Sequence, residues 1–444
     1  MGKLAVQQLF LMASILLLGT SVQASNDLDQ QINKLLQRPV LLKANQIPRL
    51  GGIALRRIQV IAKGSDGVVK AIPFQLDEFD QDGFPMVAEA DDIVVDGEWG
   101  VLDANDEVLF MASDAGSKLS SVELKDFHTL YEVSMVTGSS EKFVYLTGVR
   151  ALPNHPKHYV HFDQEKAIIK TDWYQLTLDQ SNPVIWKELF YYNYGGAEKK
   201  PTESLLDTMK VRLHSGVFTR FMNISLSNKH LKARILRVKN GPIRTVIQLE
   251  IRVVVAKIPV MKIGMQFHVM PQMIDFPSLV AIPGIFDRVM VEPTMTISLD
   301  WNDLRSSEVF TALYPKKPAI VDGHLSAHEI ALRQSGINND ENWIAIDTGK
   351  NFASVFSLKL PKDKDVGVLS FFYDDSFVLA DAPESVLGQG PNMGWKIRDM
   401  PSDVRYYMTP SLFFIDSLGD VPVVDLVSYG KYSTSAVVND TPVH

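Results

Sequence analysis

The alternation of apolar and polar residues in the middle of the chain constrains the fold more than any other feature. In residues 246–253 the apolar side chains occupy every second position, with Gln248, Glu250 and Arg252 between them. The same pattern returns in residues 261–269 after a short break that contains a proline. Successive side chains of a β-strand point to opposite faces of the sheet. The period of two therefore predicts two half-buried strands joined by a reversal.

Further short apolar runs are separated by clusters of Gly, Pro, Asn and Asp, which is the pattern of an all-β protein. One short helix is expected over residues 27–37, where apolar residues recur at helical spacing before Pro39. We predict an all-β fold, a large antiparallel β-sandwich of the supersandwich kind, with a β-rich N-terminal domain and few short helices. The remaining strands are expected at residues 208–214, 233–238, 354–360, 367–373, 406–416 and 422–429.

Residues 1–24 have the pattern of a signal peptide. Lys3 precedes an apolar run over residues 9–19, and small residues end the segment at Ala24. No later run approaches the ~20 apolar residues of a membrane span. We expect cleavage near Ala24 and a mature chain without a membrane span, located in the periplasm or secreted.

A second boundary is expected where Pro153, Asn154 and Pro156 interrupt two strand-rich regions. The predicted organisation is a signal peptide over residues 1–24, an N-terminal β-rich domain over residues 25–155 and a large β-sandwich domain over residues 156–444.

The composition excludes several classes of protein. The 52 Asp and Glu outnumber the 44 Lys and Arg, so no surface rich enough in cations for nucleic acid is expected. The absence of Cys excludes iron–sulfur clusters and haem attached through cysteine. Glycine-rich phosphate loops are also absent, so no nucleotide is expected.

An acidic turn between strands is the candidate metal site. Glu78, Asp80 and Asp82 precede Gly83, and Glu89 follows at a distance, which partly matches a calcium loop. Carboxylates at this spacing supply the oxygen ligands that Ca²⁺ prefers. The alternative is a solvated Asp-Gly turn without a metal.

Aromatic residues form the candidate ligand site. Aromatic rings stack on the apolar faces of sugars, while tyrosine hydroxyls form hydrogen bonds at a wet boundary, so an exposed set would suit a glycan. Buried packing between sheets is the alternative. Arg244, which enters the long central strand from a turn, is added to the aromatic set. The predicted ligand-binding residues are Trp186, Tyr191, Tyr192, Tyr194, Arg244 and Trp395.

Three short stretches carry a resemblance to a known group. Residues 72–83 (IPFQLDEFDQDG), 240–245 (NGPIRT) and 382–390 (APESVLGQG) resemble exported bacterial proteins of the polysaccharide-lyase-like and galactose-mutarotase-like supersandwich group. The resemblance implies a sandwich fold and glycan chemistry, and it brings no catalytic residues to defined positions.

We therefore expect an exported protein that binds a polysaccharide or another extracellular glycan, stabilised by calcium at the acidic turn. One alternative is a polysaccharide lyase or hydrolase that uses a Tyr or His base, with Arg or Lys neutralising a substrate carboxylate. For glycoside hydrolysis the candidate acid and base are the carboxylates of Asp374, Asp375, Asp381 and Glu384, which otherwise belong to a loop that caps one end of the sandwich. Another is a non-catalytic subunit of an envelope assembly with an envelope protein as partner. Whether the protein is an enzyme stays open at this point.

Overall fold

The computed structural model divides the chain into two compact units. Unit 1 is Met1–Gly83, Val94–Lys157 and Ser428–His444, and unit 2 is Phe84–Ile93 and His158–Val427. The main crossing at residues 157 and 158 lies two residues from the predicted boundary. The sequence did not predict the return of the C-terminal segment to unit 1. The described residues are 27–88, 93–137, 140–196, 203–255, 257–337, 342–360, 368–375, 390–398, 400, 405–433 and 436–442, so the predicted signal peptide lies outside them.

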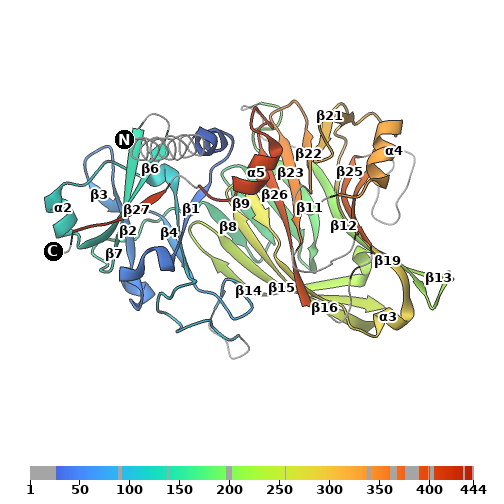
Figure 1. Ribbon diagram of the computed structural model, residues 1–444, viewed down its shortest axis with the longest axis horizontal. Coiled ribbons are helices and arrows are strands. Elements are labelled where there is room, and N and C mark those ends of the chain that lie inside the picture. The colour runs from blue at the N-terminus through green and yellow to red at the C-terminus, as the bar shows by residue number, and fades with distance from the viewer. Residues whose placement is uncertain are drawn as a thin grey trace, which may run out of the picture. The chain divides into compact units, whose positions relative to one another are not determined.

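Unit 1 is built from two antiparallel sheets (Figure 1). Val40 and Val108 from the first sheet and Val60 and Val144 from the second belong to one apolar core. The first sheet has the order β1 (Pro39–Lys43), β5 (Glu107–Met111), β4 (Phe74–Asp77). The second has the order β27 (Val437–Asp440), β6 (Thr129–Thr137), β7 (Ser140–Thr147), β2 (Gln59–Lys63), β3 (Val69–Ala71), and helix α2 is Ser121–Asp126.

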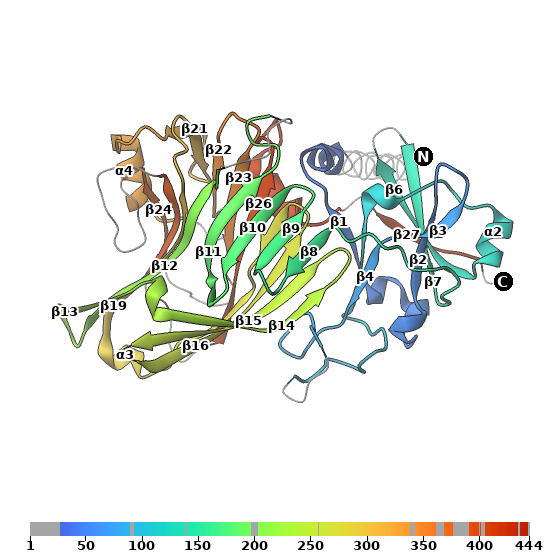
Figure 2. The ribbon, with the colours of Figure 1, turned by 180° about the vertical axis from the view of Figure 1, so that it is seen from behind.

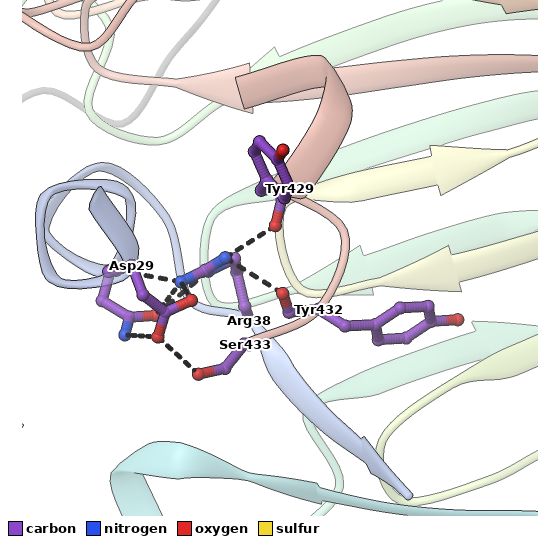
Figure 3. Close-up of polar contacts among 6 residues, drawn as sticks. Asp29, Arg38, Tyr429, Tyr432 and Ser433 are labelled. Atoms are coloured by element: carbon purple, nitrogen blue, oxygen red, sulfur yellow. Dashed lines mark hydrogen bonds and ion pairs between the residues drawn. The ribbon is translucent and has the colours of Figure 1, made fainter. Parts of the chain in front are cut away.

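Arg38 ties both ends of the chain into unit 1 (Figure 3). Its guanidinium donates to the backbone carbonyl oxygens of Tyr429 at 2.7 Å and Tyr432 at 3.0 Å, and forms a 2.7 Å ion pair with Asp29. The hydroxyl of Ser433 donates to the same carboxylate at 2.9 Å. Arg38 and Asp29 are each 2% exposed, so the loss of either side chain would leave the other as a buried charge without its partner.

Unit 2 is a two-layer antiparallel sandwich, which confirms the predicted fold class (Figure 2). One layer has the order β14 (Leu231–Asn240), β15 (Thr245–Val255), β16 (Ile258–Met270), β17 (Met273–Asp275), β26 (Arg405–Ile415), β23 (Ala353–Lys359), β22 (Trp343–Asp347), β20 (Glu308–Thr311), β21 (Tyr314–Ile320), with β18 (Ser278–Ala281) between β16 and β26.

Two sheets make the other layer of unit 2. They are β11 (Asn182–Tyr191), β10 (Tyr174–Asp179), β9 (Ile168–Thr171), β8 (Val160–Asp163), and β13 (Thr219–Leu226), β12 (Leu206–Val217), β19 (Met290–Trp301), β25 (Asn392–Arg398), β24 (Val368–Asp374). Short helices α3 (Phe286–Val289), α4 (Ala327–Gln334) and α5 (Val423–Tyr429) connect strands, and residues 27–35 of unit 1 form the short N-terminal helix that the sequence predicted.

Aromatic contacts join the two layers of unit 2. The rings of Trp186 on β11 and Phe267 on β16 lie 6.3 Å apart, and those of Phe356 on β23 and Trp395 on β25 lie 4.2 Å apart. Large rings in offset or edge contact bury much apolar area and add a specific attraction. Ile247 and Leu249 of β15 and Phe267 and Val269 of β16 therefore face a packed interior, as the period of two predicts.

One predicted strand is wrong. Residues 422–429 contain α5 instead, because Pro422 begins a helical turn in which its carbonyl oxygen accepts from the amides of Asp425 and Leu426. Proline is favoured at the start of a helix and removes a donor from a sheet ladder. Leu426 is the buried residue of this helix, so its apolar residues do not alternate between two faces.

Candidate functional site

The outward face of β14, β15 and β16 gathers cations on a chain whose net charge is −8. Cross-strand register places Arg234, Glu250 and Gly264 in one row across the three strands. Glu250 is the one acid in the sequence of these strands. We call this surface the basic face, and its residues are Lys232, Arg234, Leu236, Arg237, Lys239, Gln248, Glu250, Arg252, Lys262, Gly264, Gln266 and His268.

Glu250 organises three cations of the basic face. Its carboxylate lies 2.7 Å from Arg252, 3.2 Å from Arg234 and 3.8 Å from Lys262. Desolvation acts to raise the pKa of Glu250, but Arg252 and Arg234 outweigh it and hold the pKa below its ordinary value. The side chains of Arg234 and Lys262 are 64% and 65% exposed, so the group presents a net positive charge to solvent.

Gly264 forms the floor of a hollow in the middle of the basic face. A Cβ added at Gly264 would meet no atom within 4 Å, so the space above this residue is open. The hollow has a volume of about 190 Å³ and lies beside Glu250 and Lys262. The other side chains around it include Phe84, Leu236, Gln248 and Gln266. Gly264 has no side chain, whereas its neighbours in the row, Arg234 and Glu250, have long ones. The space left above Gly264 can hold one small ring.

Residues 84–86 of unit 2 supply a wall of this hollow. The side-chain amide of Gln266 donates to the carbonyl oxygen of Pro85 at 3.1 Å, and its Oε1 lies 2.8 Å from Nε2 of His268. The ring of Phe84 lies 5.7 Å from that of Tyr407, which is 40% exposed. An apolar ring surface therefore borders the cations, which is the combination that an acidic sugar needs.

Several of the predicted ligand-binding residues are core residues. Trp186 and Tyr191 are 1% and 0% exposed, Trp395 is 0% exposed and Arg244 is 2% exposed. A ring enclosed on both faces has no surface for a sugar, so the alternative of buried packing describes these aromatics. The hydroxyl of Tyr191 donates to the carboxylate of Asp416 at 2.8 Å.

Tyr192 and Tyr194 differ from the other predicted aromatics because both are half-buried. Tyr194 packs edge-on against Phe352 at 6.3 Å. Desolvation raises the pKa of both phenols, so each stays a neutral hydrogen-bonding group at physiological pH. Their role in ligand binding stays a prediction.

The predicted calcium ligands are spread over different environments. Glu78 is 6% exposed and accepts from the amide of Gly100 at 2.6 Å, while Asp80 is half-buried and Asp82 is exposed. Within the described ranges, no three His, Asp or Glu side chains lie close enough to hold a metal ion. The amide of Gly83 donates to the carbonyl oxygen of Asp80 at 2.9 Å, as in an Asp-Gly turn.

Glu89, the fourth predicted calcium ligand, lies outside the described residues. The calcium site therefore stays a prediction, and the melting temperature with and without millimolar calcium tests it.

The carboxylates considered for hydrolysis do not form a described pair. Asp381 and Glu384 lie outside the described residues. Asp375 is 1% exposed and accepts from the backbone amides of Asp322 and Gly323 at 3.1 and 3.2 Å. Desolvation raises the pKa of Asp375. A buried carboxyl that accepts from two backbone amides holds a loop in place.

No helix in the part of the chain that the structure describes is both long and apolar enough to cross a membrane.

No protein-family model matches the chain, and no curated protein sequence matches it. Similar solved structures include an α-mannosidase from Enterococcus faecalis V583, with 9% identity, a TM-score of 0.48, and coverage of 92% of this chain and 45% of that chain. An α-N-acetylgalactosaminidase from Bifidobacterium bifidum has 7% identity, a TM-score of 0.33, and coverage of 56% and 36%.

A Salmonella typhimurium protein provisionally described as a mutarotase has 11% identity, a TM-score of 0.29, and coverage of 59% of this chain and 89% of that chain. The chain spans just under half the length of the mannosidase. Similarities at this level carry no conclusion about activity, so function must be inferred from the chain's own residues.

Proposed function

We propose that unit 2 binds an anionic glycan on the basic face, with one sugar ring seated over Gly264. The observation that carries the proposal is the hollow itself, which lies between the ring of Phe84 and the cations around Glu250. Lys262 and Arg234 neutralise the acid groups of the glycan, while Gln248 forms hydrogen bonds to its hydroxyls. We further propose that this binding takes place outside the cytoplasm, as the predicted signal peptide requires.

Binding of two polysaccharides to the purified protein tests the proposal by isothermal titration calorimetry. Polygalacturonate carries a carboxylate on each sugar, and dextran carries none. We expect saturable binding of polygalacturonate that weakens as salt is added, because exposed charges are screened. Equal affinity for dextran would contradict the role of the cations.

The variant Lys262→Glu reverses the charge of one cation beside the hollow. Its side chain is 65% exposed, so the fold should tolerate the change, and we expect affinity to fall about tenfold, or ~1.4 kcal/mol. Lys166→Glu is the matched control, because Lys166 is 71% exposed on a turn of the same unit and lies outside the basic face. An equal loss of affinity in both variants would mean that only the net charge of the protein matters, and not the position of Lys262.

Lyase activity is the second candidate function. Leu279 of β18 pairs with Gly264 on one side and with Tyr407 on the other, so an exposed phenol lies on the same face as the hollow. Elimination beside a uronic acid needs a base and a cation that neutralises the carboxylate, and Tyr407 and Lys262 supply these groups. The products are unsaturated, so ultraviolet absorbance that grows with time on polygalacturonate would support catalysis, and a Tyr407→Phe variant should abolish it.

A further inference from the structure

An apolar cavity of about 520 Å³ lies between the layers at one end of unit 2. It is lined from β12, β13, β15, β16 and β19, and its only polar side chains among the described residues are Ser227 and Ser278. Its volume falls within the range of about 300–1,000 Å³ for small-molecule sites. The side chains of Ile251, Val253 and Met261 point away from the basic face, so the cavity lies on the other side of these strands, and Ile263 and Met265 border both the cavity and the hollow.

The cavity is open because β16 extends past the packed interior. Phe267 and Val269, near the end of β16, are fully buried, whereas Met261, Ile263 and Met265 point the same way and remain partly exposed. Soluble proteins rarely leave inward-facing apolar side chains accessible unless something occupies the space. Seven methionines line the cavity: Met209, Met261, Met265, Met290, Met295, Met400 and Met408. Flexible thioether side chains can adapt to ligands of different length.

Exposed apolar side chains lie within a few residues of Val217, Ile224, Val260 and Phe286, which line the cavity. Phe221 is 95% exposed, Phe218 69%, Ile258 65%, Met222 60% and Ile285 58%. They lie on the β12–β13 hairpin, on the β15–β16 hairpin and beside α3, and Figures 1 and 2 both show β13 and α3 at one end of unit 2. We call these five residues the apolar rim.

The backbone of the apolar rim is strained at Phe218. Phe218 has φ of 56°, a left-handed conformation that costs energy for a bulky residue and that glycine would adopt freely. Its side chain is mostly exposed, so core packing does not repay that strain. Two exposed cations lie close to the rim in sequence: Lys257, whose φ is 70°, precedes Ile258, and Arg288 is in α3. Apolar tips with flanking cations are the composition of a surface that lies on anionic lipid.

We propose that the cavity receives an acyl chain of a membrane phospholipid, taken up while the apolar rim rests on the lipid surface. The lining excludes a peptide segment, because two serine hydroxyls cannot satisfy the backbone N–H and C=O groups that a peptide would bury. An acyl chain brings no such groups. The described exposed charges near the rim are Arg220, Lys257, Arg288 and Glu292, and Glu292 pairs with Arg220. The excess of cations favours an anionic head group, which would remain outside beside Lys257 and Arg288.

Transfer of a pyrene-labelled phospholipid tests this proposal. Donor vesicles contain phosphatidylethanolamine, a minority of phosphatidylglycerol and the labelled lipid, and the full-length protein is added in increasing amounts. We expect the protein to bind the vesicles and to take up label saturably, with excimer emission falling as labelled lipids separate. A free pyrene-labelled fatty acid is offered in a parallel arm.

Three variants distinguish lipid uptake by the cavity from vesicle binding by the apolar rim. Met261→Trp, combined with Met295→Trp, fills the cavity without touching a residue of the hollow, and it should reduce uptake at least tenfold while vesicle binding persists. Phe221→Ser with Met222→Ser should reduce vesicle binding at least tenfold, and both positions are too exposed to affect the core. Val122→Ser is the matched control, because Val122 is 68% exposed on α2 in unit 1, and it should change neither.

Thermal denaturation checks that each variant is folded. Uptake that survives the filled cavity would overturn the proposal, as would equal effects of the rim variant and the Val122 control. Binding of the free fatty acid without vesicle binding would overturn the membrane as the source. Glycan binding is measured on the same samples, so failure of this proposal is distinguishable from failure of the function proposed for the basic face.

Discussion

Substitution of Gly264 should separate ligand binding from stability. Glycine within a strand destabilises a protein by roughly 0.5–1 kcal/mol relative to alanine, because its backbone loses more freedom on folding. At Gly264 nothing offsets that cost, since an added Cβ would meet no atom within 4 Å and no positive φ is required. Gly264→Ala should therefore raise the free energy of unfolding by about 0.5–1 kcal/mol.

Gly264→Trp goes further by filling the hollow of about 190 Å³ above the strand. The indole would lie beside Leu236 and Phe84, and strands favour aromatic residues, so stability should be at least that of wild type. Affinity for polygalacturonate should fall at least tenfold, or ~1.4 kcal/mol, because the sugar ring loses its seat. Gly264→Ala, which leaves most of the hollow open, should retain affinity within about threefold, or ~0.7 kcal/mol.

Urea unfolding and isothermal titration calorimetry on the same preparations provide the two readouts. A loss of stability in Gly264→Ala would mean that the space above the strand is not open. Full affinity in Gly264→Trp would mean that the glycan binds elsewhere. Either result would refute the reasoning, and the two failures point to different errors.

Three other changes have definite expected outcomes. Arg38→Ala leaves Asp29 buried without its cation, so guanidinium unfolding should show a loss of about 3–5 kcal/mol, and limited proteolysis should release the C-terminal segment sooner. Desolvation raises the pKa of Asp300 to about 6 while its ion pair with Lys210 opposes the rise, so Lys210→Met should raise that pKa further. Because the folded pKa then exceeds the unfolded value of about 3.9 by more, the free energy of unfolding of this variant should fall more steeply than that of wild type between pH 5 and pH 8. Phe218→Gly should relieve the left-handed backbone and raise stability by about 1 kcal/mol in thermal denaturation, while vesicle binding weakens.

Local pattern predicted the strands that carry both proposed sites. The period of two in β15 and β16 placed Gln248, Glu250 and Lys262 on the outward face, and the register confirms this assignment. The pattern also placed Gly264 in the same row, so the position of the hollow was present in the sequence. What the pattern could not supply was the depth of the space above that glycine.

The wall of the hollow depends on contacts between distant parts of the chain. Phe84 and Tyr407 are far apart in sequence, and they meet because β18 pairs with both β16 and β26 and because Gln266 holds Pro85. Composition also cannot distinguish a buried aromatic from an exposed one. The rings of Trp186 and Trp395 suit a sugar ligand and the protein core equally well in chemical terms. Both lie in the core, because packing between the layers buries more of their apolar area.

Neighbouring residues along β15 and β16 lie on opposite faces of the sheet. Lys262 is exposed to water and Gln266 borders the hollow, whereas the side chains of Ile263 and Met265 lie on the opposite face of the strand, toward the apolar cavity. A one-residue insertion in either strand would instead turn every following side chain over, bringing charge inside and methionine outside. Point mutations can thus alter the charged face of this hairpin or its apolar face, whereas a change in strand length would exchange the two.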